Sequence, residues 1–132
     1  MFVDTSAIIA ILTGESEAEH FSNVIAASTV RYTSPVVLLE ATMRLSSIFQ
    51  LEPDLVAELL DELVRRTRME MVAVNTEMGR VAVKAFSQYG KGRNPAGLNF
   101  GDCLSYGAAK TLGVALLFKG QDFNRTDIER AG

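Results

Sequence analysis

The chain has 132 residues, a formal net charge of −3, and a composition that is 48% hydrophobic and 22% charged. This is the composition of a folded globular protein, so we expect a single domain over residues 1–132 with no disordered segment. One cysteine and one histidine exclude an internal disulfide and a zinc site, and the negative charge argues against nucleic-acid binding through bulk electrostatics.

The first half of the chain alternates short apolar segments with helical patterns. Apolar residues at intervals of three and four predict helices, whereas short apolar runs beside them predict buried strands. In chain order we expect a strand over 1–3, a helix over 6–12, a helix over 15–28, a strand over 30–35, and helices over 36–49 and 52–67.

The second half continues this alternation and completes an α/β pattern. We expect a strand over 69–74, a helix over 76–90 capped by Thr76, a glycine-rich loop over 90–99, a helix over 100–113, a strand over 114–118, and a loop and tail over 119–132. Strands that are apolar throughout indicate a sheet covered on both faces. The sequence therefore predicts an α/β domain of three layers, α/β/α, around a mainly parallel central sheet of four to five strands.

The sequence shows no sign of a membrane segment. No basic region precedes the apolar start, and no apolar run approaches the roughly 20 residues needed to cross a bilayer. We therefore expect a cytoplasmic protein.

Four of the 16 acidic residues do not belong to a polar helix face. Asp4 follows the first strand, Glu40 interrupts the apolar stretch VVLLEATM, Asp102 opens a helix of mostly buried residue types, and Asp122 follows the last strand. Ligands of parallel α/β sheets bind at the carboxyl ends of the strands. We therefore expect these four carboxylates to converge at that edge.

Converging carboxylates predict a metal-dependent reaction. In a half-buried cleft they repel one another and lose hydration, so that without a counter-ion they would hold protons. A divalent cation such as Mg²⁺ or Mn²⁺ reverses this effect because it prefers hard oxygen ligands. Such a cation also bridges to phosphate oxygens and lowers the pKa of an attacking water, so the pattern predicts hydrolysis of a phosphodiester.

Each of the four acids also has a structural interpretation. Asp4 and Asp102 suit the caps of the helices that they introduce, and Asp122 suits a turn. Glu40 has Arg44 four residues further on, at the spacing of a helical ion pair. These interpretations are independent of one another. The acids would have no function only if all four structural interpretations were correct at once.

Four segments, in this order, resemble the PIN-domain ribonucleases: FVDTSAIIAIL, the helix that carries Glu40, NFGDCLSYGAAK and FKGQDFNRTDI. The similarity extends from Phe2 to Ile128 and is greatest to the VapC toxins of VapBC toxin–antitoxin modules. It implies an Mg²⁺- or Mn²⁺-dependent endoribonuclease that cleaves tRNA, rRNA or mRNA and thereby inhibits translation and growth. By position, Asp4 and Asp102 match the principal metal ligands of the family, and Glu40 matches the third acid.

The fourth carboxylate departs from the family pattern. Many members have Asp-x-Asp-Phe after the last strand, where this chain has Gly120 in place of the first acid. Asp122 is therefore the first candidate for the fourth carboxylate, and Asp127 is the second, with a helix cap as its alternative role.

The resemblance also implies partners: an RNA substrate, a second copy of the chain in a homodimer, and a VapB-type antitoxin as a separate chain. The C-terminal segment of such an antitoxin lies across the acidic cleft, where an arginine suits the negative charge. Four basic residues are candidate contacts to RNA phosphates, with ordinary solvated charges as the alternative: Lys91, Arg93, Lys119 and Arg125. We expect the aromatic side chains of Tyr89 and Phe100 to be buried rather than available to stack on a base.

Two other classes of protein are alternatives. A phosphoryl-transfer or phosphatase-type α/β domain, such as a response-regulator receiver, would use an acid after a strand and a lysine after the last one. Lys119 suits that lysine, but the acid pair expected early in such a chain is missing. A non-catalytic PIN-like binding module would have lost the carboxylates, of which this chain keeps at least three.

Overall fold

The computed structural model, which describes residues 1–132, has a central sheet of four short strands. They are β1 (Phe2–Val3), β2 (Tyr32–Thr33), β3 (Glu70–Met71) and β4 (Leu116–Leu117), in the spatial order β3-β2-β1-β4. Every neighbouring pair is parallel. The residues of the two strands β1 and β4 are all buried, as expected for strands covered on both faces. The predicted mainly parallel sheet is confirmed, with four strands.

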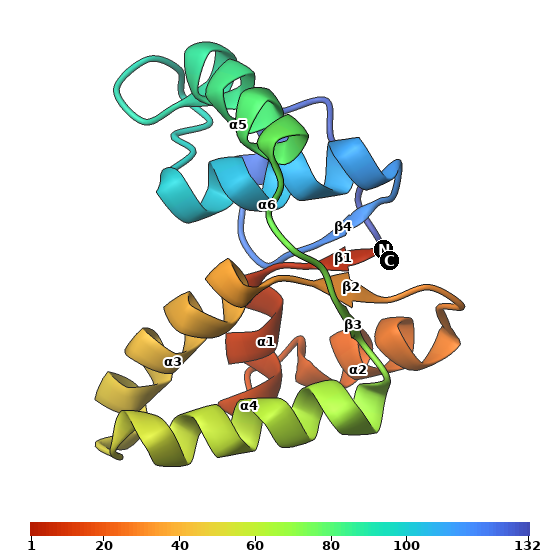
Figure 1. Ribbon diagram of the computed structural model, residues 1–132, viewed down its shortest axis with the longest axis vertical. Helices are drawn as coiled ribbons and strands as arrows, with labels where there is room; N and C mark the ends of the chain where they lie inside the picture. Colours follow the sequence, from red (N-terminus) through yellow and green to blue (C-terminus); the bar gives the residue numbers. More distant parts are fainter.

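Helices cover both faces of this sheet. They are α1 (Thr5–Leu12), α2 (Ala18–Ala27), α3 (Pro35–Phe49), α4 (Pro53–Thr67), α5 (Thr76–Tyr89) and α6 (Phe100–Leu112). Helices α1 to α4 lie on one side of the sheet and the closely packed pair α5 and α6 on the other, which gives the predicted α/β/α order of layers (Figure 1). None of these helices combines the length and the apolar character that a membrane span requires.

The structure corrects two local predictions. The side chain that caps α5 is Asn75, whose Oδ1 accepts from the backbone N of Met78 at 2.9 Å, and Thr76 is the first helical residue. The predicted loop after β4 contains a 3₁₀ helix, η1 (Asp122–Arg125). It forms because Gly120, at φ 101°, turns the chain back and the ring of Phe123 packs 4.9 Å from that of Phe118.

Candidate active site

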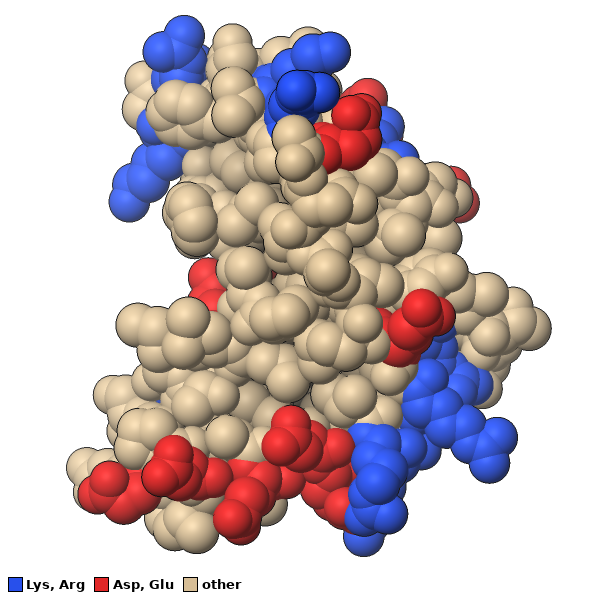
Figure 2. Space-filling model, viewed as in Figure 1, with Lys and Arg blue, Asp and Glu red and all other residues tan.

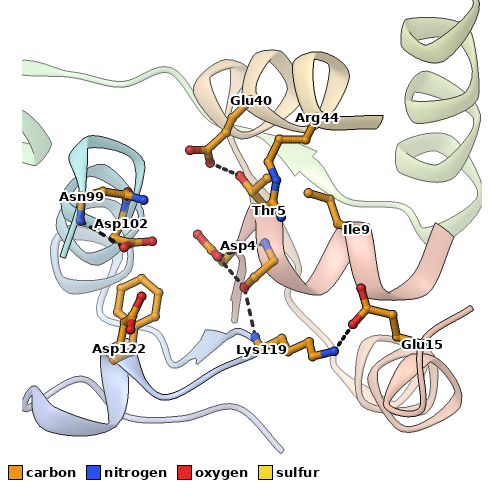
Figure 3. Close-up of a pocket in the computed structure, with 12 residues that line it drawn as sticks. Asp4, Thr5, Ile9, Glu15, Glu40, Arg44, Asn99, Asp102, Lys119 and Asp122 are labelled. Carbon is orange, nitrogen blue, oxygen red and sulfur yellow. Dashed lines mark hydrogen bonds and ion pairs between the residues drawn. The ribbon is translucent and has the colours of Figure 1, made fainter. Parts of the chain in front are cut away.

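A cavity of about 400 Å³ lies beside the carboxyl ends of β1 and β4, and all four predicted acids line it (Figure 3). Asp4 directly follows β1, Glu40 comes from α3, Asp102 from α6, and Asp122 is the first residue of η1. Because β1 and β4 are adjacent and parallel, the segments that follow them leave the sheet at the same edge. The sheet topology thus gathers carboxylates that are up to 118 positions apart in the chain.

Asp4 is the most rigidly held of the four. Its side chain is 3% exposed, and its Oδ2 accepts from the backbone N of Ser6 at 3.0 Å and from Ser6 Oγ at 2.6 Å. Its Oδ1 accepts from Ser105 Oγ on α6 at 2.6 Å. Asp4 is therefore the cap of α1, as its structural interpretation predicted, and the same carboxylate also lines the cavity.

A short hydrogen-bond chain joins Asp4 to the end of β4. The hydroxyl of Ser6, which donates to Asp4, accepts from the backbone N of Lys119 at 3.0 Å. The segments that follow β1 and β4 are thereby tied together beside the cavity.

Asp102 also combines a helix cap with a place in the cavity. Its Oδ2 accepts from the backbone N of Asn99 at 3.1 Å, and the backbone N of Asp102 donates to Asn99 Oδ1 at 2.9 Å. Burial, followed by repulsion from Asp4, Asp122 and Glu40, raises the pKa of Asp102 to about 7, although the Asn99 hydrogen bond acts in the opposite direction. The negative charges of the other three acids therefore act on this carboxyl group.

Glu40 is held by α1 and α6 rather than by its own helix. Its Oε1 accepts a hydrogen bond from the hydroxyl of the buried Thr5, the first residue of α1. Its carboxylate also lies against the backbone of α6 at Gly101. Arg44 lines the same cavity but forms no ion pair with Glu40, so the structural alternative for this acid is wrong.

The two candidates for the fourth carboxylate lie in different places. Asp122 is exposed and lines the cavity. Asp127 lies outside it, where its carboxylate accepts from Tyr106 Oη at 2.5 Å and from Lys110 Nζ at 3.1 Å. These two donors, Tyr106 first, lower the pKa of Asp127. The structure thus brings Asp122, and not Asp127, to the other three acids.

Of the four predicted basic residues, only Lys119 lines the cavity. Its ammonium group pairs with Glu15 and, at 3.3 Å, with Glu17 in the segment between α1 and α2. Arg125 donates to the backbone oxygen of Pro95 at 3.3 Å and is exposed. The ammonium group of Lys119 therefore already forms ion pairs within the protein when no RNA is bound.

Lys91 and Arg93 are exposed in the loop between α5 and α6. Basic side chains lie at this end of the molecule, and acidic side chains follow α4 at the other end, where a second group of basic side chains lies at the C-terminal end of α4 (Figure 2). The negative net charge is therefore unevenly distributed. Of the two aromatic residues expected to be buried, Tyr89 packs against Tyr106 with its ring at 5.9 Å, but Phe100 is 79% exposed, so that prediction is wrong for Phe100.

Several residues that hold the acids in place were not predicted from the sequence: Thr5, Ser6, Asn99 and Ser105. Ser105 carried a usable signal, because it follows Asp102 by one helical turn and therefore lies on the same face of α6. The contact of Thr5 with Glu40 depends on tertiary structure alone.

The donor set of the cavity fits a hard divalent cation. Five carboxylates line it against two cationic side chains, and one of these, Lys119, is already paired with acids. Burial, and after it the charges of the other three acids, raises the pKa of Asp102, and a cation bound beside it would oppose both effects. In the present side-chain arrangement no three carboxylates are placed to share one ion, so binding would require the side chains to draw together.

Comparisons with known proteins identify the family. The model of the PIN domain matches residues 1–129. Ribonuclease VapC30 of Mycobacterium tuberculosis is 43% identical over 128 residues, which cover 97% of this chain and 95% of that protein.

Two solved structures share the fold. The crystal structure of M. tuberculosis VapC20, described as a sarcin-ricin loop cleaving toxin, matches with a TM-score of 0.73 and 19% identity over 96% of this chain and 95% of that one. VapBC2 of Rickettsia felis, bound to a DNA fragment from its promoter, matches with a TM-score of 0.72 and 15% identity over 98% and 94%. The chain therefore belongs to the PIN-domain family and, within it, to the VapC ribonucleases.

Proposed function

We propose that this chain is the toxin of a VapBC module and hydrolyses RNA phosphodiester bonds with a divalent cation, Mg²⁺ or Mn²⁺, bound by Asp4, Glu40, Asp102 and Asp122. The observation that carries the proposal is the convergence of these four carboxylates, from four separate elements, on one cavity. The names of the curated relatives support the ribonuclease activity. No observation favours a receiver-type phosphotransfer domain or a non-catalytic module.

The residues of the cavity have different tasks in this proposal. When bound, the cation lowers the pKa of a water molecule and neutralises charge on the phosphate. Asp4 is held in one direction by three hydrogen bonds. Asp102, with its pKa near neutrality, must release a proton when a cation binds. Asp122, exposed on η1, has the freedom to follow substrate or cation.

Substitution of single acids tests this assignment with a matched control. Asp4→Asn and Asp102→Asn should abolish cleavage of labelled RNA in Mg²⁺ or Mn²⁺ while the circular dichroism spectrum stays unchanged. Asp127→Asn removes an acid outside the cavity and should cleave at the rate of the wild type. Full activity of the first two variants, or of the wild type in excess EDTA, would contradict the mechanism.

We further propose that Lys91 and Arg93 contact phosphates of the RNA away from the cleaved bond. Their exposure and their place in the loop that leads into α6, close in sequence to Asp102, support this role. A Lys91→Ala/Arg93→Ala variant should bind RNA more weakly and with a shallower salt dependence, whereas an Arg65→Ala/Arg66→Ala variant at the far end of α4 should not. Unchanged RNA affinity of the first variant would refute the proposal.

The partners complete the proposal. Related solved structures are toxin–antitoxin complexes, which supports a VapB-type antitoxin that covers the acidic cavity. Co-expression with the product of the neighbouring gene should suppress new RNA ends that appear when this chain is expressed alone, and mapping these ends would identify the RNA.

We also propose a homodimer, because large apolar side chains are exposed on α3, α5 and α6: Leu39, Met43, Val83 and Phe100. Light scattering should give twice the mass of the chain, and Met43→Glu or Val83→Glu should reduce it. A monomeric wild type would refute this part of the proposal.

A further inference from the structure

Gly101, in the first turn of α6, lies directly beneath the carboxylate of Glu40. A β-carbon built on Gly101 would overlap Glu40 Oε2 and would lie 2.8 Å from both Oε1 and Cδ. The φ of Gly101 is not positive, so its backbone conformation is open to any residue. Glycine is therefore suited to this position only because it has no side chain, which leaves room for the Glu40 carboxylate.

The opposite side of the same carboxylate is held by Thr5, whose hydroxyl donates to Glu40 Oε1. Thr5 is 2% exposed and Gly101 is buried, so both residues that contact the Glu40 carboxylate are packed inside the protein and have little room to move. The early backbone N–H groups of α6 also favour a negative charge at this place. Glu40, although it comes from α3, is thus fixed by the starts of two other helices (Figure 3).

We propose that Gly101 is a positioning residue for the metal site, because the absence of its side chain admits the Glu40 carboxylate to the cavity that Asp4 and Asp102 share. The proposal rests on the proposed function, in which Glu40 is a metal ligand. A side chain at position 101 would push this carboxylate away from the other acids without removing any donor atom from the chain.

The other helical glycines provide contrasts. A β-carbon on Gly79 in α5 would meet nothing within 4 Å, whereas one on Gly107 would overlap the backbone oxygen of Met78 in α5. Gly107 thus allows α5 and α6 to pack closely, and Gly79 has no such constraint. Only at Gly101 is the obstructed group a carboxylate of the candidate site.

The experiment compares Gly101→Ala with Gly79→Ala. Alanine favours a helix more than glycine does, so helix propensity alone would raise the melting temperature of both variants. We expect Gly101→Ala to weaken binding of Mn²⁺, measured by calorimetry with the metal alone, by about 10-fold, a change typical of residues that orient metal ligands. Gly79→Ala should bind Mn²⁺ as the wild type does.

A double substitution separates the contact with Glu40 from a general effect on α6. With Glu40→Ala already present, adding Gly101→Ala should not change Mn²⁺ affinity further, because the obstructed carboxylate is absent. If Gly101→Ala fails to fold, Gly101→Ala/Glu40→Ala should fold, since the overlap is gone. Failure of both variants to fold would overturn the proposal, because the obstruction would then not be Glu40.

The outcomes also distinguish this inference from the proposed function. If Gly101→Ala binds Mn²⁺ and cleaves RNA as well as the wild type does, the inference about Gly101 is wrong, but the proposed function is unaffected. A crystal structure of Gly101→Ala with the Glu40 carboxylate in its original place would show the same. Absence of Mn²⁺ binding and cleavage in the wild type would overturn both.

Discussion

Replacing Asp102 with asparagine should stabilise the metal-free protein at neutral and alkaline pH while abolishing its response to metal. The pKa of this carboxyl group is about 7 in the folded chain, against 3.8 as its ordinary value, because burial and three neighbouring acids disfavour its charged form. Asparagine is neutral at every pH, and its side-chain oxygen retains an acceptor for the backbone N of Asn99. The substitution thus removes the charge and keeps the cap.

The sign and size of the effect follow from proton linkage. Between the ordinary pKa of 3.8 and the folded value of about 7, the folded state of the wild type binds more protons than the unfolded state. Its stability therefore falls as the pH rises through this window and then stays low. Three pKa units correspond to a ceiling of about 4 kcal/mol. Because Asp102 is only half-buried and asparagine loses a favourable interaction with the helix dipole, we expect a gain of about 2 kcal/mol.

Urea unfolding in EDTA at pH 5 and pH 8 measures this gain. Because more than a third of the window lies below pH 5, the wild type and Asp102→Asn should differ by about 1 kcal/mol more at pH 8 than at pH 5. Addition of Mn²⁺ should stabilise the wild type at pH 8 and leave the variant unchanged. A variant that is less stable than the wild type at pH 8 would show that the Asp102 carboxylate makes net favourable contacts, and the argument from repulsion would be wrong.

Three further predictions concern other residues of the site and of α6. Asp122→Asn should lower the initial rate of RNA cleavage at least about 10-fold, and the same rate in Asp127→Asn should be unchanged; the reverse result would assign the fourth carboxylate to Asp127. Ser105→Ala removes a hydrogen bond to the buried Asp4 and should lower the free energy of unfolding in urea by about 2 kcal/mol; an unchanged value would show that water replaces the hydroxyl. Gly107→Ala should lower stability by about 1–3 kcal/mol in thermal unfolding, because its methyl group would overlap the backbone of α5, whereas a stabilised variant would show that the two helices can separate without loss.

The arrangement of elements was largely predictable from the sequence, because burial on both faces gives parallel strands an apolar character that periodic helices do not share. Fine boundaries were less predictable. Asn75 and Thr76 are adjacent residues that both suit a helix cap, and only the backbone geometry assigns the role to Asn75. The 3₁₀ helix after β4 depends on packing between Phe123 and Phe118, which a local pattern does not encode.

The convergence of the acids was predictable in outline, since a parallel sheet brings the ends of neighbouring strands to one edge. The choice between Asp122 and Asp127 was not, because both follow the last strand and the 3₁₀ helix η1, which begins at Asp122, lies between them. The ion pairs of Lys119 with Glu15 and Glu17 join segments more than 100 positions apart, so no local pattern could reveal that this lysine is engaged.

For Asp4 and Asp102, structural and functional interpretations are not alternatives. Each caps the start of a helix and also lines the cavity, so the hydrogen bonds that stabilise the helix also fix the direction of the carboxylate. Alanine at either position would remove a cap, at about 1 kcal/mol, together with a ligand, and its effect on cleavage would not separate the two roles. At position 102, asparagine keeps an acceptor oxygen for the backbone N of Asn99 and removes the charge. At position 4, both carboxylate oxygens accept hydrogen bonds, so asparagine also exchanges one acceptor for an amide donor. A loss of cleavage in Asp102→Asn, without loss of stability, is therefore the result that assigns that carboxylate to chemistry rather than to helix capping.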